Sequence, residues 1–157
     1  MDAIDSKGGL VLAQLKAIDQ NLRQGIQDLA TLMSQSAPDE EALSRTRLKL
    51  TRLTGRRRAL IQCTILPHLR DLPPAGAAQL ANLRLDAAAA SVKFSSHITR
   101  WTTRAIRTDW AGYQAVSAEM RRSIVKQIER EAALLYPLLE AKPGVALELT
   151  PLVAEGN

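Results

Sequence analysis

The chain has 157 residues, which fits a single domain, and its 21 Lys and Arg residues outnumber its 16 Asp and Glu residues to give a net charge of +5. A domain of this size folds without a disulfide or a structural metal, and its single cysteine, Cys63, excludes an internal disulfide and fits a reducing compartment. No run approaches the ~18 apolar residues of a membrane span, and the acidic start does not resemble a signal peptide, so we expect a cytoplasmic protein.

The first predicted element is an amphipathic helix over about residues 9–34. Apolar side chains recur at spacings of three and four from Val11 to Met33, which is the pattern of a helix with one face in a core. The following segment contains Pro38 and is predicted to be a loop, with the proline near the first turn of the next helix.

The second predicted helix covers about residues 40–70. Pro67 lies near its end and is expected to kink or terminate it, because proline lacks the backbone donor that a helix interior requires. Gly55 lies inside this helix, and we interpret it as a point where a neighbouring helix comes close.

Two further helices are predicted over about residues 77–111 and 114–140, with the segment 109–112 (DWAG) as the end of the first of them. Strand-favouring residues are sparse, so the fold class is all-α. Four long helices with short loops predict an antiparallel up-down-up-down four-helix bundle over residues 1–142. Residues 143–157 contain two prolines and two glycines and are predicted to form an irregular C-terminal tail.

Four polar side chains fall on or beside the predicted core faces: Arg57, His97, Gln127 and Glu131. A buried charge without a partner is costly, so we expect Arg57 and Glu131 to pair inside the bundle, with Gln127 and His97 hydrogen-bonded nearby. Such a cluster fits either a structural role, in which it fixes the register of the helices, or a role in ligand binding.

The segment 128–139 (IEREAALLYPLL) resembles the last-helix signature of the hemerythrin-like (HHE cation-binding) family, roughly H-I-x-x-E-E-x-x-L-Y-P-L. Gln127 occupies the His position of that signature, and Glu131 occupies the Glu position. The segment 15–19 (LKAID) resembles the family's H-x-x-I-D opening, with Leu15 in place of His. The resemblance covers roughly residues 9–141.

Two more positions follow from the same resemblance. Arg57 and Ile61 hold the second helix's His and Glu positions, and His97 matches the third helix's His. The family's fold implies a di-iron site held by inward His and carboxylate side chains. Here Leu15 and Ile61 cannot bind metal, and Arg57 is cationic. The resemblance therefore points to a degenerate, metal-free member without a cofactor.

A basic face is predicted on the second helix. Arg45, Lys49, Arg52 and Arg56 are spaced at i, i+4, i+7 and i+11, which places them on one side of the helix. This face suits an acidic protein partner, a phosphate or a membrane surface. The alternative is a solvated face whose cations pair with acidic residues on neighbouring helices. We do not expect nucleic-acid binding, because aromatic residues are scarce and no known motif is present.

The functional hypothesis is a non-enzymatic regulatory or protein-interaction module on a metal-free hemerythrin-like bundle. One alternative is a metal- or oxygen-binding protein with an atypical site that uses His97, Glu131 and Asp19. A further alternative is histidine phosphotransfer through His97, because Arg100 follows three residues later. The sequence leaves a homodimer open.

Overall fold

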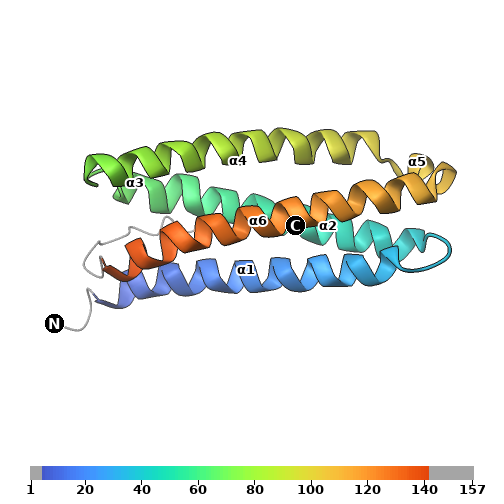
Figure 1. Cartoon of the computed structure of the whole chain (residues 1–157). Coiled ribbons are helices and arrows are strands. Elements are labelled where there is room, and N and C mark those ends of the chain that lie inside the picture. Colours follow the sequence, from blue (N-terminus) through green and yellow to red (C-terminus); the bar gives the residue numbers. More distant parts are fainter. Residues whose placement is uncertain (1–4, 142–157) are drawn as a thin grey trace.

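The computed structural model of the protein describes residues 5–141, and in that part of the chain it contains helices and no strand. The all-α prediction is confirmed. The long elements lie side by side (Figure 1) and are α1 (Asp5–Met33), α2 (Glu40–Ala59), α4 (Pro74–Arg100) and α6 (Trp110–Ala141). The short elements are the π-helix η1 (Leu60–Ile65), α3 (Leu66–His68) and α5 (Thr103–Thr108). None of these helices has the length and apolarity to cross a bilayer. The tail predicted over 143–157 lies outside the described residues.

The second predicted helix is divided into α2, η1 and α3. It begins where the Asp39 side chain accepts a hydrogen bond from the Ala42 N–H at 3.1 Å. Pro67 lies in the short last segment, as expected of a proline near a helix end. A proline there cannot donate to the carbonyl one turn earlier and crowds it, and the wider π-turn just before Pro67 relieves that crowding.

The predicted boundaries of the third and fourth helices were wrong. The α4 helix ends at Arg100, and a new turn, α5, begins after Thr102, whose hydroxyl accepts from the Ala105 N–H at 3.2 Å. The DWAG segment begins α6 instead of ending the previous helix. Asp109 accepts a hydrogen bond from the Gly112 N–H at 2.9 Å, which caps the start of α6.

The core consists of two apolar clusters along the bundle axis. Leu15, Ile65 and Leu135 belong to the first cluster, and Leu22 and Tyr113 belong to the second. The α1 helix packs against both α2 and α6, whereas α4 packs mainly against α6. Among the residues of α4, burial is limited to Leu80 and Leu83 near its start. The α4 helix is therefore the most loosely attached of the long helices.

The close approach predicted at Gly55 is wrong, and it occurs at Gly25 instead. A Cβ built on Gly55 has no neighbour within 4 Å, whereas a Cβ on Gly25 lies 2.8 Å from Leu50 Cδ2. The close contact between α1 and α2 therefore depends on the absence of a side chain at Gly25.

Replacing each glycine by alanine should separate helix propensity from packing. Gly55→Ala should raise the free energy of unfolding by about 0.5–1 kcal/mol, because alanine loses less conformational freedom in a helix. Gly25→Ala should gain clearly less or should destabilise, because Leu50 must shift. Urea denaturation followed by circular dichroism measures both. Equal stabilisation by the two changes would show that the α1–α2 contact tolerates a methyl group.

Candidate functional site

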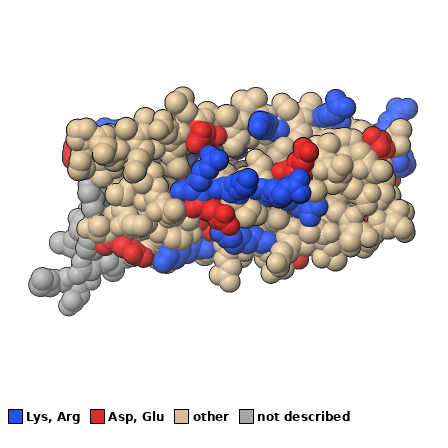
Figure 2. All heavy atoms as spheres, in the orientation of Figure 1, with Lys and Arg blue, Asp and Glu red and all other residues tan. Residues whose placement is uncertain are grey.

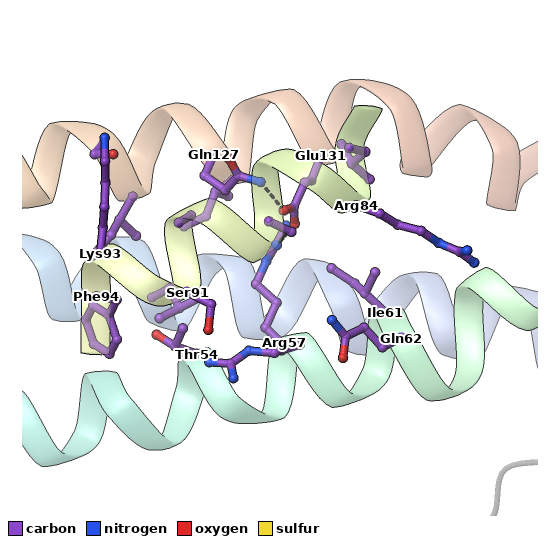
Figure 3. Close-up of a pocket in the computed structure, with 18 of the residues that line it drawn as sticks. Thr54, Arg57, Ile61, Gln62, Arg84, Ser91, Lys93, Phe94, Gln127 and Glu131 are labelled. Atoms are coloured by element: carbon purple, nitrogen blue, oxygen red, sulfur yellow. Dashed lines mark hydrogen bonds and ion pairs between the residues drawn. The ribbon is translucent and has the colours of Figure 1, made fainter. Parts of the chain in front are cut away.

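Three charged side chains from three helices meet in the interior: Asp19 of α1, Arg57 of α2 and Glu131 of α6. Their exposed fractions are 3%, 6% and 3%. Arg57 Nε donates to Asp19 Oδ1 at 2.5 Å, and Arg57 Nη1 donates to Glu131 Oε2. The structure thus contains the predicted buried pair of Arg57 and Glu131. Figure 3 shows Arg57 reaching from its helix toward Glu131. We call these three residues the polar layer.

The second oxygen of each carboxylate also accepts a hydrogen bond. Gln127 Nε2 donates to Glu131 Oε1 at 2.5 Å, and the Tyr136 hydroxyl donates to Asp19 Oδ2 at 2.5 Å. Burial, and then the hydrogen bond to the Asp19 carboxylate, raise the pKa of Tyr136 well above its usual range. Tyr136 therefore remains a neutral donor, and both carboxylates are held on both of their oxygens.

Arg57 keeps its charge in this setting. Burial by itself lowers the pKa of the guanidinium, but hydrogen bonds and charges from Asp19 and Glu131 outweigh burial and raise it. Its Nη2 is buried and lacks a hydrogen-bond partner among the described residues. Two carboxylates against one guanidinium leave the polar layer with one excess negative charge. The layer thus offers one unused donor.

A cleft of about 110 Å³ lies between α4 and the other long helices, and we call it the α4 cleft. Arg57, Gln127 and Glu131 form part of its lining (Figure 3). Ala87 and Ala90 of α4 also line it. Further apolar lining comes from Leu22, Ile61, Leu66, Leu83, Phe94, Met120, Ile124 and Ile128. The space exists because the small alanine side chains do not fill the gap that α4 leaves opposite the polar layer.

His97 does not join the polar layer, which corrects the prediction that placed it there. Its ring stacks on Tyr113 with centroids 5.8 Å apart, and its Nδ1 is buried without a described partner. It faces a void of about 30 Å³ that Arg47 and Ser117 also line. Burial, and then the positive charge of Arg47, lower the pKa of His97. His97 lies at the edge of the apolar stripe of α4, and its side chain therefore packs at the contact between α4 and α6 instead of in the polar layer.

Two members of the site were missed or undervalued in the sequence. Asp19 was considered only as an alternative metal ligand, although it lies one turn after Leu15 on the core stripe of α1. Tyr136 was noted only as part of the last-helix motif. The available signal was that Asp19 shares the core face with Leu15 and Leu22, where an acid requires a cationic partner.

The donor set does not fit the di-iron centre that the sequence resemblance implies. Leu15 and Ile61 are buried apolar side chains, and the guanidinium of Arg57 stands between the two carboxylates. The oxygens of Asp19 and Glu131 are all used in hydrogen bonds. Within residues 9–141, whose side chains the structure describes, no three His, Cys, Asp or Glu side chains converge into a group that could hold a metal ion.

The predicted basic face is present as a strip of exposed cations on α2, formed by Arg45, Lys49, Arg52 and Arg56. Arg45 pairs with Glu41 at 3.4 Å, whereas the other three make no ion pair with any described residue. A second group of cations was not predicted: Figure 2 shows Lys and Arg side chains gathered over α6 in the middle of one face. The spacing of Arg122, Lys126 and Arg130 places three exposed cations along α6.

Comparison with known proteins gives no relative for this chain. No protein-family model, no curated protein and no solved structure matches it. The function must therefore be argued from the chemistry of the chain's own residues.

Removing the guanidinium should destabilise the fold severely. Arg57→Met leaves two buried carboxylates without a cation, which should lower the free energy of unfolding by about 3–5 kcal/mol. Adding Asp19→Asn and Glu131→Gln removes the unpaired charges and should recover a large part of that loss. Thermal and urea denaturation measure both variants. If the triple variant is no more stable than Arg57→Met, lost packing is the cause and not unpaired charge.

His97 should make stability depend on pH on the acid side of neutrality. Its folded-state pKa lies below the ordinary value of 6.5, so the unfolded chain takes up the proton first as the pH falls. The contribution is complete above pH 6.5 and is lost below it, with a slope of at most about 1.4 kcal/mol per pH unit. His97→Gln should flatten the stability profile between pH 6.5 and 5 in urea titrations. An unchanged slope in this variant would assign the effect to other groups.

Proposed function

We propose that this protein is a metal-free, hemerythrin-like four-helix bundle that acts as a non-enzymatic regulatory or protein-interaction module. The single observation that carries the proposal is the position of Arg57 between Asp19 and Glu131, in the interior where such a bundle would hold its metal. The four long helices lying side by side agree with that architecture (Figure 1).

A guanidinium in this position competes with metal binding in two ways. It occupies the space between the carboxylates, and its positive charge repels a divalent cation. The carboxylates are further held by Gln127 and Tyr136, so a metal would have to break four hydrogen bonds to gain two ligands. The layer also lacks a mobile acid or base, because each of its oxygens is engaged. These features favour a scaffold whose function is binding.

The exposed strip on α2 is the proposed contact for an acidic protein partner. Three of its four cations have no ion pair among the described residues, so a partner's carboxylates would not have to displace an internal one. Exposed cations of this kind steer an acidic surface toward the protein more than they tighten the final complex. The interaction should therefore weaken steeply with salt.

Elemental analysis of freshly purified protein tests the metal-free part of the proposal. After expression with added iron, we expect less than about 0.1 iron, zinc or manganese per chain, because two engaged carboxylates cannot hold the ion. The visible spectrum should lack an iron charge-transfer band. Stoichiometric iron, lost in Glu131→Ala, would overturn the proposal and favour the atypical metal site instead.

Charge reversal tests the α2 strip. Arg45→Glu, Lys49→Glu and Arg52→Glu together should change the free energy of unfolding by no more than about 1 kcal/mol, because exposed substitutions cost little. The variant should lose affinity for a fluorescein-labelled poly-glutamate peptide, measured by anisotropy at low salt. Reversal of Arg122, Lys126 and Arg130 on α6 is the control with the same change in net charge. Equal losses in both variants would mean that net charge and not the strip attracts the peptide.

A further inference from the structure

We propose that the α4 cleft is a binding site for a medium-chain carboxylate, with the acid group beside Arg57 and the hydrocarbon chain running toward Phe94. This inference deepens the proposed function, since it names a small ligand for a scaffold that we propose has no metal. It depends on the α4 cleft and not on the α2 strip.

The shape of the cleft suits a narrow apolar chain. Its volume of about 110 Å³ is close to the size of engineered apolar cavities that take up benzene. From Ala87 to Phe94 the wall of α4 extends over seven residues, or about 10 Å of helix. Along that length the α4 side chains facing the cleft include Ala87, Ala90 and Phe94, and α6 supplies Ile124 opposite. A hydrocarbon chain would therefore find mainly apolar contacts, with Thr54, Ser91 and Ser123 as polar residues in the lining.

Arg57 forms the polar end of the cleft and has a buried nitrogen without a partner among the described residues. Arg57 is 6% exposed, it lines the cleft, and its Nη2 has no partner among the described residues. A buried donor without an acceptor is costly, so the site gains when a ligand oxygen accepts from it. The other two guanidinium nitrogens are fixed by Asp19 and Glu131, so a small opening of the cleft at Arg57 would expose a donor that is already oriented.

The charges around this end favour a carboxylate over a neutral oxygen. Arg58 on α2 and Arg84 on α4 line the same cleft, and neither forms an ion pair within the part of the chain that the structure describes. Their charges add to that of Arg57, although the Arg84 side chain extends away from Arg57 in Figure 3. Lys93 lies with Phe94 toward the opposite end (Figure 3), so it does not compete for the same acid group.

The helix next to this end has an unusual conformation. The π-helix η1 begins three residues after Arg57, and its Ile61 and Gln62 line the cleft. A π-turn closes its hydrogen bond over one more residue than an α-helical turn and occurs frequently at functional sites. Here it coincides with the end of the cleft at which we place the carboxylate.

Isothermal titration calorimetry with octanoate and 1-octanol tests the proposal on the full-length protein. Octanoate should bind one per chain with a Kd of about 0.1–1 mM, which is typical of a ligand with ten heavy atoms. 1-Octanol, with the same chain and no charge, should bind at least about threefold more weakly. Binding of 1-octanol as tight as that of octanoate would overturn the carboxylate part, and no binding of either would overturn the site.

A cavity-filling variant locates the ligand. Ala90→Leu places a larger side chain in the cleft and should weaken octanoate about tenfold or more, while thermal stability stays the same or rises. Ala89→Leu is the matched control, because Ala89 is exposed and does not line the cleft, and it should leave the Kd unchanged within about twofold. Equal effects in both variants, or none in Ala90→Leu, would place the ligand elsewhere.

A charge-reversal pair tests the position of the acid group. Arg58→Glu with Arg84→Glu should weaken octanoate about tenfold and leave 1-octanol unchanged. The control is Arg45→Glu with Lys49→Glu on the α2 strip, which makes the same change in net charge away from the cleft. Weakening of octanoate in both pairs alike would overturn the assignment. Failure of octanoate to bind a protein that is free of metal would sink this inference and leave the proposed function intact, whereas stoichiometric iron would sink the latter alone.

Discussion

The buried contact of one guanidinium with two carboxylates constrains most of the structure. Arg57 holds Asp19 of α1 and Glu131 of α6 in a region that water barely reaches. Buried charges are tolerated only when their partners are in position. Removing one partner of a buried ion pair lowers the free energy of unfolding by about 3–5 kcal/mol. The apolar clusters on either side accept some sliding, but the polar layer does not. We therefore interpret the layer as the feature that fixes the register of α1, α2 and α6.

The same contact explains why α4 stands apart. Arg57 uses one nitrogen for α1 and one for α6, and nothing in the layer binds α4. That helix offers alanines where a tight core would need leucines, and its buried residues, Leu80 and Leu83, lie near its start. The α4 cleft is the consequence, and Arg57, whose third nitrogen has no partner among the described residues, forms part of its wall. The fixed packing of α1, α2 and α6 and the loose packing of α4 therefore have the same origin, which is the set of contacts that Arg57 makes.

Sequence periodicity was sufficient for the long helices and for the pair of Arg57 and Glu131, because polar side chains on apolar stripes must find one another. It failed at Trp101–Thr102, where nothing in helix propensity marks the break and only the capping hydroxyl of Thr102 restarts the helix. Periodicity also misplaced His97. Successive side chains on a helix point about 100° apart, so a residue at the edge of an apolar stripe can contact either of two neighbouring helices. The α4 cleft could not be predicted from the sequence, because alanines on a core face indicate close helix packing and not an open cavity.

A guanidinium can take over the structural role of a metal in a helical bundle, but it cannot take over the chemical role. Like a metal, it joins carboxylates from different helices and neutralises much of their charge with directional bonds. Unlike a metal, it cannot exchange ligands, polarise a bound oxygen or change its redox state. In the proposed function, Arg57 therefore maintains the helix packing without supplying that chemistry. Binding is the role that we propose for the bundle, and Arg57, whose Nη2 has no partner among the described residues, forms part of the wall of the α4 cleft.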